Sequence, residues 1–158
     1  MSKFGNIVRV AKEVGGKTYT FRSKLEYRWA VWCQLRKEDG IIIDWWFEDE
    51  DTLLELETAY HGNIKKYLPD FTIQTTEGYE YEETKGYFPP KDYTKMKLAT
   101  EQYENPITLI FASLIDHSKN AKVRAQYDRA KRLEPYLKRV IYDAKETIFK
   151  PIKGLFDL

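Results

Sequence analysis

The chain has 158 residues, 42% of them hydrophobic, so we predict a single domain over residues 1–158. Its net charge of +1 shows that it is not a uniformly basic protein. No apolar run approaches the roughly 18 residues that a membrane span requires, and the N-terminus lacks a secretory signal, so we expect a cytoplasmic protein with no membrane partner. Cys33 is the only cysteine, which excludes an internal disulfide and a zinc site of several cysteines.

The first segment is predicted to form a hairpin followed by a helix. Residues 7–10 and 18–21 are short extended pieces on either side of Gly15-Gly16, where glycine allows the chain to reverse. Residues 23–37 are predicted to form an amphipathic helix, because apolar side chains recur at a spacing of three to four. These side chains belong to Leu25, Trp29, Trp32 and Cys33.

Strands are predicted to follow this helix. Gly40 ends it, and residues 41–47 form a run of β-branched and aromatic residues that is typical of a strand. We expect a turn and a second strand around residues 52–57. Residues 67–74 and 78–85 then resemble two antiparallel strands of a hairpin, with Gly78 at the reversal.

The remaining segments predict a β-α-β unit and a basic extension. Residues 92–104 have a helical apolar spacing and precede the apolar run 107–114, so this run should pair in parallel with the strand 78–85. A basic helix is predicted over residues 120–134, within a helical extension of about 119–158, and residues 140–142 are a candidate edge strand. The predicted fold is α/β, a mixed central sheet flanked by helices.

Charge is separated along the chain. Residues 44–57 contain seven acidic residues and no Lys or Arg, whereas residues 119–139 contain eight basic residues and two acidic ones. One part of the surface can therefore attract phosphate while another repels it.

The fragments Tyr67-Leu-Pro-Asp70-Phe and Glu83-Thr-Lys85-Gly carry the strongest chemical signal. Side chains alternate along a strand, so Glu83 and Lys85 should share one face while Glu82 and Thr84 point to the other. If the hairpin pairs as predicted, the Asp70 carboxylate reaches the same place as that of Glu83. Two convergent carboxylates form the oxygen-only site that Mg²⁺ prefers.

Glu26 is a further candidate ligand, because it lies at the edge of the helix face that must pack on the sheet, and a carboxylate there needs a partner. Each signal also has a purely structural explanation. Ser23 and Glu26 fit a capping box at the helix start. Pro69-Asp70 fits a simple turn, and an acid two residues before a lysine fits a surface ion pair.

Taken together, the order of these motifs resembles that of the PD-(D/E)xK nuclease superfamily. Residues 20–115 are similar in motif order and sequence to the phage endonuclease I type of Holliday junction resolvase. The resemblance implies a restriction-endonuclease-like core and a symmetric dimer that cuts branched DNA. It also implies that Glu26, Asp70 and Glu83 hold Mg²⁺, for which Mn²⁺ substitutes, and that Lys85 completes the catalytic site. The segment 40–66 and the basic C-terminal helix depart from that pattern.

A phage-encoded protein acting in a bacterial cytoplasm would fit this resemblance. Two alternatives stay open: a nuclease for nicked, mismatched or linear double-stranded DNA, as in repair, restriction or transposition, and a DNA-binding module without activity. Trp45, Trp46, Tyr87 and Phe88 could stack on unpaired bases or pack in the core. No role is assigned to His61 or His117. The candidate DNA-backbone contacts are Arg22, Lys24, Lys65, Lys66, Lys91, Lys95, Lys122, Arg124, Arg129, Lys131 and Arg132.

Overall fold

The computed structural model describes residues 9–57, 66–114 and 119–158, and the structural statements below concern these residues. They contain a five-stranded sheet in the order β3, β6, β7, β8, β9. β3 (Asp44–Phe47), β6 (Phe71–Thr75) and β7 (Gly78–Lys85) pair antiparallel, whereas β8 (Ile107–Phe111) and β9 (Arg139–Ile141) continue the sheet in parallel. The prediction of an α/β fold with a mixed central sheet is confirmed.

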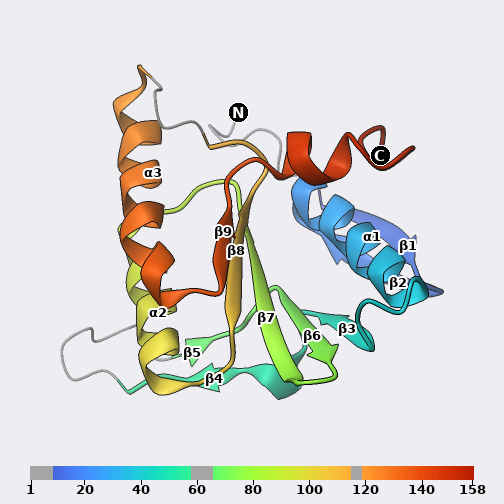
Figure 1. The fold of residues 1–158 in the computed structure, drawn as a ribbon, viewed down its shortest axis with the longest axis horizontal. Helices are drawn as coiled ribbons and strands as arrows, with labels where there is room; N and C mark the ends of the chain where they lie inside the picture. The colour runs from blue at the N-terminus through green and yellow to red at the C-terminus, as the bar shows by residue number, and fades with distance from the viewer. Residues whose placement is uncertain (1–8, 58–65, 115–118) are drawn as a thin grey trace.

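Helices cover this sheet on two sides (Figure 1). α1 (Lys24–Glu38) lies on one side together with the hairpin of β1 (Val10–Val14) and β2 (Lys17–Phe21). α2 (Pro90–Gln102) and α3 (Ala121–Leu133) lie side by side on the other, and each connects two parallel strands. The predicted β-α-β unit, basic helix and edge strand are therefore present. The predicted hairpin is present as well, but its first strand is Val10–Val14 rather than residues 7–10, of which residues 7 and 8 lie outside the described ranges.

The remaining elements are short. β4 (Leu54–Glu55) pairs antiparallel with β5 (Lys66–Tyr67) in a separate two-stranded sheet. Two 3₁₀ turns, Glu50–Thr52 and Glu134–Tyr136, and a π-helical turn, Lys145–Phe149, complete the chain. Within residues 119–158, helix α3 thus gives way to β9 and then to the π-helical turn.

Two apolar clusters hold the layers together. In the first, Trp29 of α1 packs with Phe71 of the sheet and with Phe149 and Leu155 from the end of the chain. In the second, α2 and α3 pack on β8, whose five residues are all buried. Full burial of β8 explains why its sequence is apolar at every position except Thr108 rather than alternating. The C-terminal residues are therefore part of the packing beneath α1.

Several predicted boundaries were wrong for local reasons. Residues 41–43 precede the strand rather than belong to it, and Ile41 is 63% exposed. The predicted strand 67–74 is divided at Pro69, which has no N–H to donate to a neighbouring strand. Its first part pairs with β4 and its second part with β7, which leaves Asp70 at the junction of two sheets.

Burial shows that two of the four candidates for stacking on bases belong to the core. Trp45 and Phe88 are buried in the two clusters, as the core interpretation predicted. Trp46 is half-buried, and Tyr87 is 50% exposed. Cys33 is fully buried on α1, as expected for a small apolar side chain, and burial raises the pKa of its thiol.

A buried ion pair joins α1 to the central strand. Arg36 donates to both carboxylate oxygens of Glu82, over 2.9 and 2.6 Å, and the Trp29 indole donates to Glu82 over 2.9 Å. Both charged residues are less than 10% exposed. Glu82 thus points toward α1, to the opposite face from Glu83, as strand alternation predicts.

Replacing Arg36 with Met should lower the free energy of unfolding by about 3–5 kcal/mol, because Glu82 would then be a buried carboxylate without its cation. The double variant Arg36→Met/Glu82→Leu should recover most of this loss, because no unpaired charge is left behind. Urea denaturation of the two variants and the parent measures both effects. A double variant as unstable as Arg36→Met would contradict this explanation.

Candidate metal centre

Asp70 is held from two directions by strand β7. One carboxylate oxygen, Oδ2, accepts hydrogen bonds from the backbone N–H and the hydroxyl of Thr84, both at 2.9 Å. The backbone N–H of Asp70 donates to Oε1 of Glu83 over 3.0 Å. These bonds fix Asp70 one step beyond the Phe71–Glu82 pair of the β6–β7 hairpin. The structure therefore brings Asp70 and Glu83 together, as the sequence suggested.

Lys85 lies beside these two acids rather than in solvent. Its ammonium nitrogen is 3.6 Å from Oε2 of Glu83 and 2.9 Å from Oδ2 of Asp92. Asp92 comes from the first turn of α2, so the start of that helix helps to position the lysine. Asp92 could not be recognised as a partner of Lys85 from the sequence, because its proximity depends on how α2 packs against the sheet.

Glu26 reaches the same region from the start of α1. Ser23 caps the helix by accepting from the Glu26 N–H over 3.1 Å. The Glu26 carboxylate accepts from the backbone N–H of Arg22 over 2.6 Å, one residue before the position that a capping box uses. Capping therefore accounts for one oxygen of Glu26, and its other oxygen faces the site.

Glu48 is a site residue that the sequence analysis missed. It follows β3, and its backbone N–H donates to the Asp70 carbonyl over 2.8 Å. Among non-glycine residues in the described ranges it alone has a positive φ, 47°. This left-handed backbone is unfavourable for a residue with a Cβ. The acidic run 44–57 was visible in the sequence, but nothing in it distinguished Glu48 from its six acidic neighbours.

Glu26, Glu48 and Asp70 form an acidic cluster that could hold a metal ion. Each contributes one carboxylate oxygen, and these oxygens lie within 4.8 Å of one another. Glu83 is not part of this group, since its carboxylate faces the Asp70 N–H and Lys85. Of the three ligands that the resemblance implies, Glu26 and Asp70 belong to this cluster and Glu83 does not, and Glu48 is the third acid of the cluster.

Arg22 places a positive charge inside the acidic cluster. Its Nη2 atom is 3.2 Å from Glu26 and 3.7 Å from Asp70, and it also donates to Glu48. Burial alone lowers the pKa of Arg22, but the three carboxylates outweigh it and raise the pKa overall. The side chain is half exposed, at 51%.

Burial controls the protonation of the acids. It raises the pKa of Glu26 and of Glu48, and it raises the pKa of Glu83 well above its usual range, where the charge of Asp70 adds to the effect. For Lys85, burial lowers the pKa, but the carboxylates of Glu83 and Asp92 outweigh it and raise the pKa overall. The lysine is therefore a cation at neutral pH.

Tyr67 is a buried neighbour that the sequence did not single out. It is 1% exposed, and its hydroxyl has no hydrogen bond of good geometry to the described residues. Burial, followed by the charges of Glu83 and Asp70, raises the pKa of Tyr67 well above its usual range. An unsatisfied buried hydroxyl next to carboxylates is a position at which a further polar group would be stabilised.

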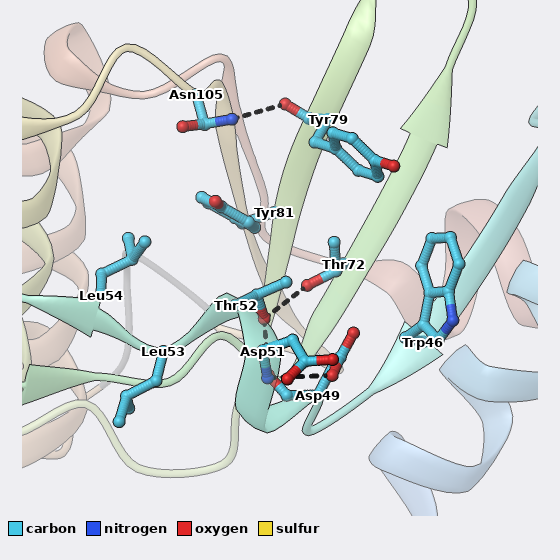
Figure 2. Close-up of a pocket in the computed structure, with 10 residues that line it drawn as sticks. All are labelled: Trp46, Asp49, Asp51, Thr52, Leu53, Leu54, Thr72, Tyr79, Tyr81 and Asn105. Carbon is cyan, nitrogen blue, oxygen red and sulfur yellow. Dashed lines mark hydrogen bonds between the residues drawn. The ribbon is translucent and has the colours of Figure 1, made fainter.

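A pocket of about 360 Å³ opens on the sheet face that carries Glu83, nearer the start of β7 (Figure 2). Its lining includes Tyr79 and Tyr81 of β7, Trp46 of β3, and the acidic residues Asp49 and Asp51. The rings of Trp46 and Tyr79 are 6.2 Å apart. Aromatic walls with adjacent carboxylates suit a group that donates hydrogen bonds, whereas a phosphate would be repelled.

The candidate DNA-contact residues fall into two sets. Exposed side chains belong to Arg22, Lys24, Lys66, Lys91, Lys122, Arg124, Lys131 and Arg132. Lys95 and Arg129 are half-buried, and Arg129 donates to the Phe88 carbonyl, which gives it a structural contact of its own. Lys131 lies 3.3 Å from Glu134 and over the Tyr142 ring. Lys65, His61 and His117 lie outside the described residues.

Comparisons of the chain with family models, curated proteins and solved structures found no match. Within the described ranges, each helix is too short or too polar to span a bilayer.

Glu83→Gln should make the metal-free protein more stable at neutral pH, by about 1 kcal/mol. The folded pKa of Glu83 is raised, so the folded state binds a proton that the unfolded chain releases. Stability is then lost as pH rises from the unfolded pKa, roughly 4.3, toward the folded one. Urea denaturation between pH 5 and pH 8 in EDTA should show a flatter pH dependence for Glu83→Gln. Exposed Glu77→Gln is the control, and an equal slope in all three proteins would contradict the assignment.

Proposed function

We propose that this chain is a Mg²⁺-dependent endonuclease of the PD-(D/E)xK type that cuts branched DNA, most specifically four-way junctions. The observation that carries the proposal is the meeting of Asp70 with Glu83 and Lys85 at one end of the β6–β7 hairpin, beside Glu26. Acidic residues scattered by chance over the surface would not come from three separate segments and meet at one buried position. A single chemical function at this position would account for all of these sequence motifs.

The donor set suits a hard divalent cation. Carboxylate oxygens from Glu26, Glu48 and Asp70 would hold Mg²⁺ or Mn²⁺, with water and a phosphate oxygen as further ligands. Bound there, the ion would lower the pKa of an attacking water and neutralise charge on the phosphate.

Lys85 is the residue best suited to act on the reacting groups. It is charged, and contacts to Glu83 and Asp92 restrict its side chain. From this position an ammonium can orient a water molecule or stabilise negative charge as it develops on the phosphate. Glu83 acts as a positioning residue, since it accepts from the Asp70 N–H and pairs with Lys85.

The substrate assignment rests on charge and on the resemblance. The segment 119–139 carries eight basic residues against two acidic ones, and several of them lie exposed on α3. Contacts of this kind recognise the phosphate backbone, so selectivity would come from DNA shape and bendability rather than base sequence. A homodimer would supply the two matched cuts that a four-way junction requires.

Asp70→Asn should abolish cleavage of a synthetic four-way junction in Mg²⁺, by at least about 10³-fold, while junction binding in Ca²⁺ survives. The amide keeps the shape of the side chain but removes the charge that holds the ion. Exposed Asp157→Asn is a matched control. Cleavage is measured on end-labelled junctions with mapped cut positions, and binding by gel shift. If Asp70→Asn loses binding and cleavage together, the acids do not act through the metal alone.

Linear, nicked and mismatched duplexes in the same assay separate the proposed substrate from the alternatives. Preference for one of these over the junction would favour a repair, restriction or transposition type of nuclease. Binding without Mg²⁺- or Mn²⁺-dependent cleavage of any DNA form would instead identify a DNA-binding module.

Neutralising Lys131 and Arg132 to Gln should weaken junction binding about tenfold and reduce the slope of log K against log salt by about 2, because two phosphate contacts are lost. Lys12→Gln/Lys17→Gln, on the hairpin across the sheet from α3, removes the same charge and should change neither quantity (Figure 1). Fluorescence anisotropy at several salt concentrations measures both. An unchanged slope in the α3 variant would remove this helix from the proposed contact surface.

A further inference from the structure

Arg22 stands where a cation bound by the acidic cluster would have to stand. A single nitrogen, Nη2, contacts Glu26 at 3.2 Å, Asp70 at 3.7 Å and Glu48 at hydrogen-bonding distance. The oxygens that these acids contribute lie within 4.8 Å of one another. One guanidinium group therefore neutralises part of the charge of all three carboxylates.

A divalent ion and this guanidinium cannot occupy the cluster together. Divalent ions bind carboxylate oxygens at about 2.0–2.6 Å, and three oxygens at the observed spacing leave one central position. The Nη2 atom lies within 3.7 Å of a carboxylate oxygen of each of the three acids and therefore competes for that position. Two positive groups there would also repel each other at short range. Binding of the ion thus requires the Arg22 side chain to leave.

The rest of the site stays in place when Arg22 leaves. Glu26 keeps its bond from the backbone N–H of residue 22, which does not depend on the side chain. Asp70 keeps its two bonds from Thr84. The Arg22 side chain is 51% exposed, so it can turn into solvent without opening a cavity in the core.

We propose that Arg22 is a resident counter-ion that holds the acidic cluster together in the metal-free protein and is displaced when a divalent ion binds. This inference rests on the proposed metal site. It also makes the predicted DNA contact of Arg22 depend on metal binding. The guanidinium is bound by carboxylates until the ion arrives, and only then can it contact a phosphate oxygen of the substrate.

Arg22→Met should bind Mn²⁺ about tenfold more tightly than the parent protein, because the competing cation has been removed while the ligands persist. In EDTA the same variant should have a lower Tm, since three carboxylates lose their counter-ion, and Mn²⁺ should raise its Tm by more than it raises that of the parent. Isothermal titration calorimetry and thermal unfolding measure these quantities without any nuclease assay.

Lys17→Met is the matched control, because it removes one positive charge from an exposed position on β2 and should leave the Mn²⁺ affinity unchanged. Equal or weaker Mn²⁺ binding by Arg22→Met, with the parent still binding, would overturn the role of Arg22 and leave the metal site standing. Failure of both proteins to bind Mn²⁺ would overturn both. Binding by Arg22→Met alone would be the strongest support for the displacement.

A second measurement uses the parent protein and does not depend on the variant folding. Phenylglyoxal modifies accessible arginine side chains, and peptide mass spectrometry reports the rate at each one. Arg22 should react faster in Ca²⁺ than in EDTA, whereas buried Arg36 should react slowly in both. An Arg22 rate that does not rise with Ca²⁺ would contradict displacement.

Discussion

The attachment of Asp70 to strand β7 is the constraint on which the rest of the site depends. Pro69 ends one strand pairing and Phe71 begins another, so the intervening residue has no sheet partner of its own. Thr84 and Glu83 supply the missing bonds, the first to the carboxylate and the second to the backbone N–H. Because each is a directional hydrogen bond in a buried place, the Asp70 carboxylate has one orientation, and the other acids converge on it.

The two faces of β7 place their glutamates in different electrostatic surroundings. Glu82 points to α1 and is fully paired with Arg36 and Trp29, whereas Glu83 points to α2 and shares its surroundings with another acid. Burial of these two neighbouring glutamates therefore has different consequences. The Glu82 carboxylate has its hydrogen-bond partners inside the protein, whereas the Glu83 carboxylate lowers the stability of the fold. A carboxyl group whose pKa is raised by burial and by a neighbouring acid is common where a protein binds an ion or a substrate.

Sequence reasoning recovered the parts of this arrangement that depend on local rules. Alternation along a strand was enough to put Glu83 and Lys85 on one face, and apolar periodicity was enough to bring Glu26 to the edge of the α1 packing face. Glu48, Asp92 and Tyr67 were missed because their proximity arises from tertiary packing of segments that are distant in the chain. The contacts of Arg22 with three carboxylates were missed in a similar way, since an exposed cation near a helix start gives no sign of them.

The packing of the chain's last turns beneath α1 has a consequence for synthesis. α1 carries Glu26, and its buried face contacts Phe149 and lies in one apolar cluster with Leu155. During translation Phe149 and Leu155 are made long after α1, so α1 cannot complete its packing on the sheet until they have emerged from the ribosome. The acidic cluster draws on α1, β3 and the β6–β7 hairpin and forms only with that long-range packing. A nascent chain that has not yet exposed Phe149 and Leu155 therefore lacks the packing of α1 on which the geometry of the acidic cluster depends.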